Sequence, residues 1–85
     1  MTYRVELTPR ARRDLKNLSV QIQSRLRPHI EGLAENPRPH GIKKLAGEDD
    51  TYRIRVGAYR ILYQIQDEIL LVLVVKIAPR REAYR

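Results

Sequence analysis

The sequence predicts an α+β fold: an N-terminal strand, a hairpin of two helices, and a three-stranded antiparallel meander, all forming one sheet. Residues 51–64 alternate apolar and polar side chains on both sides of a Gly-Ala pair, as two strands joined by a tight turn do. Residues 8–35 instead repeat apolar side chains every three or four positions, which is typical of amphipathic helices. Residues 69–75 are an uninterrupted apolar run, which predicts a central strand covered on both faces.

The helical part of the chain carries its own boundary signals. Tyr3 to Leu7 alternates as a first strand, and Thr8 followed by Pro9 predicts a cap and the first turn of a helix. The apolar pattern is interrupted at residues 17–19, where Ser19 can cap a second helix. The first segment is therefore expected to lead into a hairpin of helices.

The second helix is expected to continue to about Glu35. Its apolar positions are Ile22, Leu26, Ile30, Leu33 and Ala34. Pro28 lies inside this pattern and removes one backbone hydrogen bond, so we expect a kink or a local break there. Residues 36–41, rich in proline, are expected to form a loop.

Acidic residues mark the turns of the second half. Residues 43–47 lead into an acidic turn at 48–50, and a second acidic turn at 67–68 separates the hairpin from the apolar strand. Residues 76–79 are expected to end that strand, and residues 80–85 form a short basic tail.

Length and composition restrict the class of protein. Eighty-five residues allow one core, so we expect a single domain over residues 1–85. The longest apolar run is far shorter than the roughly 20 residues of a membrane span, and the N-terminus lacks the apolar segment of a signal peptide. The absence of cysteine excludes disulfides and thiolate zinc sites. We expect a cytoplasmic protein with no membrane partner.

The turn geometry brings arginines together on one face of the hairpin. If Gly57 and Ala58 form a two-residue loop, Arg55 lies directly opposite Arg60, with Arg53 two residues along the same face. The other face receives the aromatic and aliphatic side chains of Tyr52, Ile54, Val56, Tyr59, Ile61 and Tyr63. Like charges directly opposite each other destabilise a strand pair, so this arrangement indicates an anionic partner.

The net charge of the chain also indicates an anionic partner. The chain carries +7, and thirteen of its seventeen cationic residues are arginine, whose planar fork matches phosphate oxygens. If the tail folds back, Arg80, Arg81 and Tyr84 join the arginine face. RNA supplies its own 2′-hydroxyl nucleophile, and cations stabilise the additional charge of its transition state, so cleavage would need no metal. The residue pattern alone leaves open the alternative that these arginines are ordinary solvated cations.

Metal or cofactor chemistry finds no support in the sequence. His29 and His40 are eleven residues apart, without carboxylates at the spacing of metal ligands, and are interpreted as exposed or capping side chains. There is no glycine-rich phosphate loop. We therefore expect no metal and no cofactor.

Four segments resemble the RelE branch of the RelE/ParE superfamily, the toxins of type II toxin–antitoxin systems. They are Lys44-Leu45, residues 52–57, residues 59–63 and the ending 80–84, and the resemblance covers about half the chain. It implies a RelE-like fold and a ribosome-dependent mRNA endoribonuclease that cuts the codon in the ribosomal A site by 2′-hydroxyl attack. It also implies a cognate antitoxin and a toxin–antitoxin hetero-oligomer.

The resemblance implies roles for individual residues. Arg53, Arg55 and Arg60 would hold the phosphate and stabilise the transition state. Arg81, with Arg80 as the neighbouring candidate, would assist the leaving 5′-oxygen, and Tyr84 would stack on the base. The basic side chains expected to contact RNA outside the catalytic set are Lys43, Lys44 and Arg80.

One departure from the family pattern leaves the general base open. The best-characterised member has lysines at the positions of Arg53 and Arg55, and arginine rarely gives up its proton. Tyr84, or the ribosome and solvent, would have to serve, or the rate would be low. Pro79 also replaces a histidine found in many relatives. The alternative functions are a ParE-like inhibitor of DNA gyrase and a non-catalytic RNA-binding or ribosome-binding module.

Overall fold

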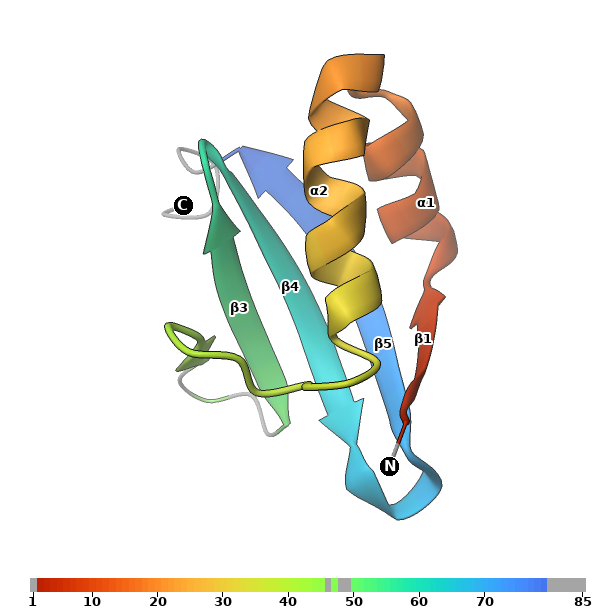
Figure 1. Cartoon of the computed structure of the whole chain (residues 1–85), viewed down its shortest axis with the longest axis vertical. Coiled ribbons are helices and arrows are strands. Elements are labelled where there is room, and N and C mark those ends of the chain that lie inside the picture. The colour runs from red at the N-terminus through yellow and green to blue at the C-terminus, as the bar shows by residue number, and fades with distance from the viewer. Residues whose placement is uncertain (1, 46, 48–49, 80–85) are drawn as a thin grey trace.

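The computed structural model describes residues 2–45, 47 and 50–79. These residues form one mixed sheet with both α-helices on the same face (Figure 1). The sheet order is β1-β5-β4-β3-β2. The elements in chain order are β1 (Arg4–Leu7), α1 (Pro9–Lys16), α2 (Val20–Gly32), β2 (Lys43–Lys44), β3 (Thr51–Val56), β4 (Tyr59–Gln66), the 3₁₀ turn η1 (Asp67–Ile69) and β5 (Leu71–Pro79).

Both predicted helix starts are confirmed. The Thr8 hydroxyl accepts a hydrogen bond from the Ala11 amide at 3.1 Å, and the Ser19 hydroxyl accepts one from the Ile22 amide at 3.2 Å. Each hydroxyl thereby satisfies a backbone donor that the first turn of a helix leaves without a partner.

The end and the interior of α2 differ from expectation. The helix ends at Gly32, and residues 33–35 form turns rather than a further helical turn. It is continuous through Pro28, so the prediction of a local break there is wrong. Proline removes one hydrogen bond, whereas fully burying an aliphatic side chain such as Leu26 or Ile30 contributes about 1.5–3 kcal/mol. The packing of the helix on the sheet therefore outweighs the lost hydrogen bond.

The arginine hairpin has the predicted register. Arg55 pairs with Arg60 across β3 and β4, and Val56 pairs with Tyr59 around a two-residue turn. Gly57 has φ +58°, a left-handed conformation that glycine adopts without the steric cost of a Cβ. The alternation along these strands directs the apolar side chains toward the helices and the arginines toward the opposite face.

The sheet is more extended than the sequence indicates. A fifth strand, β2, pairs Lys43 with Arg53 at the edge of the meander, and a parallel pairing joins β1 to β5. The start of the last strand was predicted wrongly, because Ile69 belongs to η1 and Leu70 has φ +51°. β5 therefore begins at Leu71 and continues to Pro79.

The core lies between the two helices and one face of the sheet. Its fully buried members include Leu26, Leu33, Ile61, Tyr63, Ile65, Val72 and Val74. Among the described residues, both α-helices lie on the other face of the sheet (Figure 1), and Leu73 and Val75 of β5 are only half-buried. The predicted coverage of this strand on both faces is therefore wrong for its outer side chains. In the described part of the chain, no helix has the length and apolar character needed to cross a membrane.

Candidate functional site

Four cationic side chains gather in a hollow of about 710 Å³ beside β3. They are Lys43 of β2, Arg53 and Arg55 of β3, and Arg60 of β4; Pro39, Gly41, Ile54, His29 and His40 complete the lining. We call this the basic hollow. The short strand β2 pairs with Tyr52 and Arg53 and does not extend along the rest of β3. Past the end of β2, side chains from both faces of β3 reach the hollow.

The four cations differ in exposure. Lys43 and Arg55 are exposed, Arg53 is half-buried, and Arg60 is only 1% exposed. The shared face was predicted correctly, and the alternative that Arg60 is an ordinary solvated cation is excluded by its burial. Arg60 lies on the interior strand β4, between Arg55 on β3 and Ala78 on β5. A guanidinium removed from bulk water interacts more strongly with a bound anion than one at the surface does.

The remaining predicted site residues are not brought to the basic hollow. Lys44 is exposed and pairs with Tyr52, and it does not line the hollow because successive residues of a strand point to opposite faces. Arg80, Arg81 and Tyr84, predicted for catalysis and RNA contact, lie outside the described residues. Their roles remain predictions.

Two histidines that the sequence analysis set aside also line the basic hollow. His29 comes from α2, and His40 comes from the loop between α2 and β2. Their spacing in the sequence does not match that of metal ligands, and no cluster of three or more ligand-type side chains occurs among the described residues. The sequence signal that could have indicated a place for His40 in the site is its position three residues before Lys43, in a proline-rich loop.

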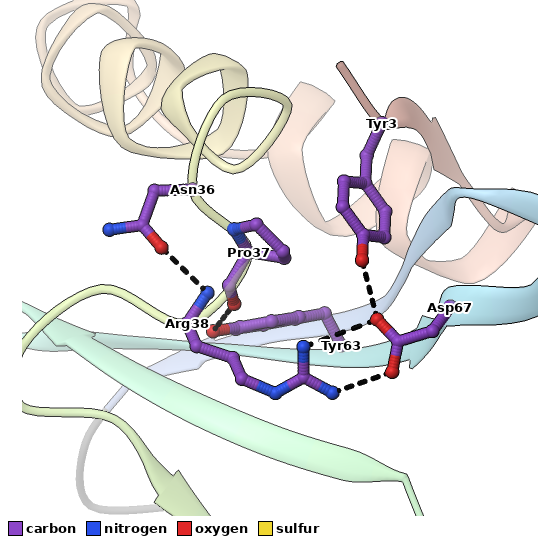
Figure 2. A network of polar contacts seen from close by, with 6 residues as sticks. All are labelled: Tyr3, Asn36, Pro37, Arg38, Tyr63 and Asp67. Atoms are coloured by element: carbon purple, nitrogen blue, oxygen red, sulfur yellow. Dashed lines mark hydrogen bonds and ion pairs between the residues drawn. The ribbon is translucent and has the colours of Figure 1, made fainter. Parts of the chain in front are cut away.

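The loop that carries His40 is anchored to the sheet by a polar network (Figure 2). The buried Tyr63 hydroxyl donates to the Pro37 carbonyl at 3.0 Å. The Arg38 guanidinium donates to both carboxylate oxygens of Asp67, at 2.8 and 3.2 Å. The Tyr3 hydroxyl donates to the same carboxylate. The N-terminal segment, the loop and η1 are thereby tied together.

Aromatic contacts add to this anchor. The Arg38 guanidinium lies 5.8 Å from the centre of the Tyr52 ring, a favourable cation–π distance. The Tyr52 and Tyr63 rings stack with their centres 6.2 Å apart. Residues 36–38 are therefore held from two sides immediately before the chain enters the basic hollow.

The pKa values in the network follow from these contacts. Hydrogen bonds from Arg38 and then from Tyr3 lower the pKa of Asp67 to about 2. The hydrogen bond to Asp67 raises the pKa of Tyr3, and burial raises the pKa of Tyr63 to about 12. Asp67 therefore stays ionised, and both tyrosines stay protonated, at neutral pH. The anchor keeps the same charges throughout the neutral range.

The chemistry of the basic hollow is that of an anion site. The described part of its lining contains four cations and two imidazoles and no carboxylate. Guanidinium forks bind phosphate oxygens through paired hydrogen bonds. The geometry is therefore suited to a phosphodiester.

Comparison with known proteins identifies the family. A sequence model described as "ParE toxin of type II toxin-antitoxin system, parDE" matches residues 5–84. The chain belongs to this toxin family. Within the superfamily its relatives carry RelE names. The "Putative toxin RelE1" of Methanocaldococcus jannaschii is 34% identical over 88 residues, covering 100% of this chain and 98% of the relative.

Two further relatives support the RelE branch. The "mRNA interferase toxin RelE" of Escherichia coli K12 is 28% identical and aligns with 98% of this chain and 88% of its own length. The crystal structure of the toxin–antitoxin complex RelBE2 from Mycobacterium tuberculosis matches with a TM-score of 0.83 and 34% identity, covering 94% of this chain and 100% of that one. The predicted RelE-like fold and the predicted membership of the RelE branch are confirmed.

Proposed function

We propose that this RelE-family toxin is a ribosome-dependent mRNA endoribonuclease that cuts the codon in the ribosomal A site and so stops translation. The observation that carries the proposal is the basic hollow, whose lining brings exposed Arg55 and buried Arg60 together with Arg53 and Lys43. The E. coli relative named as an mRNA interferase supports the same activity. The toxin would act in the cytoplasm as one RelE-like domain over residues 1–85.

The reaction we propose is an internal transesterification without a metal. The 2′-oxygen loses its proton and attacks phosphorus, the bond from phosphorus to the 5′-oxygen breaks, and that oxygen takes up a proton. The phosphorus carries extra negative charge at the transition state, and preorganised cations stabilise this charge. Arg53, Arg55 and Arg60 would bind the phosphate oxygens as this charge develops.

The outer contacts are proposed on the family resemblance. Lys43 borders the basic hollow and would hold the neighbouring backbone phosphate, with Lys44 contacting RNA outside it. Arg81 would assist the leaving 5′-oxygen by stabilising its negative charge, Arg80 would assist in binding, and Tyr84 would stack on the substrate base.

We also propose a cognate antitoxin as partner, in a toxin–antitoxin hetero-oligomer. The M. tuberculosis structure that this chain resembles is such a complex. An acidic segment lying over Arg55 and Lys43 would block the hollow and relieve the repulsion between Arg55 and Arg60, which face each other across β3 and β4.

Inhibition of DNA gyrase is the second candidate function. It is favoured by the family description, which names the ParE toxin. The concentration of cations in one hollow favours RNA cleavage over gyrase inhibition, because contact with a protein partner does not require four cations around one hollow.

Primer extension on an mRNA, with and without purified ribosomes, tests the proposal. Arg55→Ala removes an exposed cation of the hollow and should lower the cleavage rate about 100-fold or more, as loss of a donor to a developing oxyanion does. Arg25→Ala is the matched control, because Arg25 is an exposed arginine of α2 that does not line the hollow. The control should cleave within about threefold of wild type, since isolated surface charges contribute little.

The outcomes separate the candidate functions. Cuts inside codons that require both ribosomes and Arg55 support the nuclease. If no cuts appear in this assay and the protein instead inhibits supercoiling by gyrase, the result would assign the ParE activity to the protein. Ribosome binding without any cut would leave a non-catalytic binding module.

A further inference from the structure

The basic hollow contains side chains that can exchange a proton near neutral pH. Arginine holds its proton, so Arg53 and Arg55 are poor general bases. Among the residues that the structure describes, no carboxylate lines the hollow. Among the described residues of its lining, the groups suited to proton transfer at neutral pH are the imidazoles of His29 and His40.

We propose that His40 is the general base that removes the proton from the attacking 2′-hydroxyl, an inference that rests on the nuclease activity proposed above. His40 lies in the loop that runs directly into Lys43, and Lys43 pairs with Arg53 of the cationic face. Arg38 and Pro37, just before it, are fixed to Asp67 and Tyr63. An anchored loop holds an acid–base group in one position relative to the phosphate, as proton transfer requires.

His29 is placed less favourably. It belongs to the helix and also borders a smaller hollow of about 180 Å³, whose lining includes Pro28, Gly32 and Leu33. This second hollow lies on the helix side of the sheet. His29 therefore borders the basic hollow from the wall opposite the cationic face.

The proton and electron pairs balance in this assignment. The neutral imidazole of His40 accepts the 2′-hydroxyl proton while the 2′-oxygen forms its bond to phosphorus. The 5′-oxygen leaves with the electron pair of its broken bond and takes a proton from a separate donor, a solvent water. The products are a 2′,3′-cyclic phosphate and a 5′-hydroxyl.

His40 must be neutral to act, so the rate should depend on pH. The charged and titratable groups around it in the hollow are His29 from α2, Lys43 from β2, Arg53 and Arg55 from β3, and Arg60 from β4. The arginines and the lysine remain cationic across the neutral range. A loss of rate on acidification within pH 5–8 is therefore expected to come from an imidazole.

Single-turnover cleavage of mRNA on programmed ribosomes, from pH 5.5 to 8.5, tests the assignment. Wild type should lose rate on the acid side of this profile, a feature that we call the acid limb. His40→Gln should lower the rate at pH 7.5 about 100-fold or more and abolish this acid limb, as removal of a general base does. His29→Gln carries the same chemical change in the same hollow and should retain the limb. Ribosome binding by each variant, measured in parallel, separates catalysis from affinity.

A substrate with sulfur in place of the leaving 5′-oxygen separates the base from the acid. Thiolate leaves without a proton, so a missing acid no longer limits the rate, whereas a missing base still does. His40→Gln should therefore remain slow on this substrate.

Each contrary result has a distinct meaning. If the His40→Gln variant recovers its cleavage rate on the substrate with sulfur as the leaving atom, His40 is the acid, and its assignment as base is overturned. Loss of the acid limb in His29→Gln alone, or its retention in both variants, would overturn the role of His40 while leaving the nuclease intact. Wild-type protein that does not cleave would overturn the proposed function and this inference together.

Discussion

Replacing Tyr63 with phenylalanine tests whether the loop beside the basic hollow is held by one buried hydrogen bond. Tyr63 has no exposed surface, and its hydroxyl donates to the carbonyl of Pro37, which is itself buried, at 3.0 Å. Phenylalanine keeps the ring and its stacking on Tyr52. The substitution therefore removes the hydrogen bond with little change in packing.

The expected cost follows from that geometry. A buried carbonyl left without its donor costs about 1–3 kcal/mol of unfolding free energy. Phenylalanine no longer has a hydroxyl to desolvate, so we expect the lower part of that range. For a chain of this size, each kcal/mol shifts the melting temperature by roughly 4–8 °C. Tyr63→Phe should therefore melt several degrees below wild type.

Urea unfolding and thermal melts of wild type, Tyr63→Phe and Tyr59→Phe provide the assay. Tyr59 is half-buried on the same face of the hairpin, and its hydroxyl makes no hydrogen bond within the described residues. Tyr59→Phe should change the unfolding free energy by less than about 0.5 kcal/mol, as substitutions that remove no interaction usually do. Equal effects of the two substitutions would refute the role assigned to the Tyr63 hydrogen bond.

Two further predictions concern the network and the turn. The pKa of Asp67 is about 2 in the folded protein against an ordinary value of 3.8, so its stabilising contribution is complete above about pH 4 and is lost as the pH falls toward 2. The urea midpoint of wild type should fall more steeply over pH 4 to 2 than that of Asp67→Asn, and parallel curves would contradict this. Gly57 has φ +58°, so Gly57→Ala should cost about 1–2 kcal/mol, measured by thermal melting, whereas Gly57→Asn should cost less because asparagine tolerates this conformation. Equal melting temperatures for the alanine variant and wild type would show that the turn accommodates a Cβ.

The helix starts and the hairpin register were predictable because short-range chemistry determines them. Thr8 and Ser19 each cap an amide three residues ahead. Gly57 and the alternation beside it determine that Arg55 faces Arg60, because a two-residue turn permits one register. The cationic face was inferred from the same local pattern.

Other features of the fold and of the site are not indicated by the residues next to them in the sequence. Two lysines in sequence do not predict a strand, and β2 exists because Lys43 and Lys44 meet the edge of β3. Pro28 signals a break by its own chemistry, but the packing of α2 on the sheet maintains the helix. The position of His40 in the basic hollow was missed for the same reason, since its neighbours there belong to other elements.

The sequence by itself determined the elements, the turn, the charge and the resemblance to the RelE toxins, since each depends on residues within a few positions of one another or on composition. Only the tertiary structure decided that Arg60 is buried and that two histidines share a hollow with four cations. The physical reason is that both features depend on residues far apart in the sequence: the strand order sets Arg60 between residues of β3 and β5, and closing the loop after α2 onto η1 brings His40 to the edge of β3.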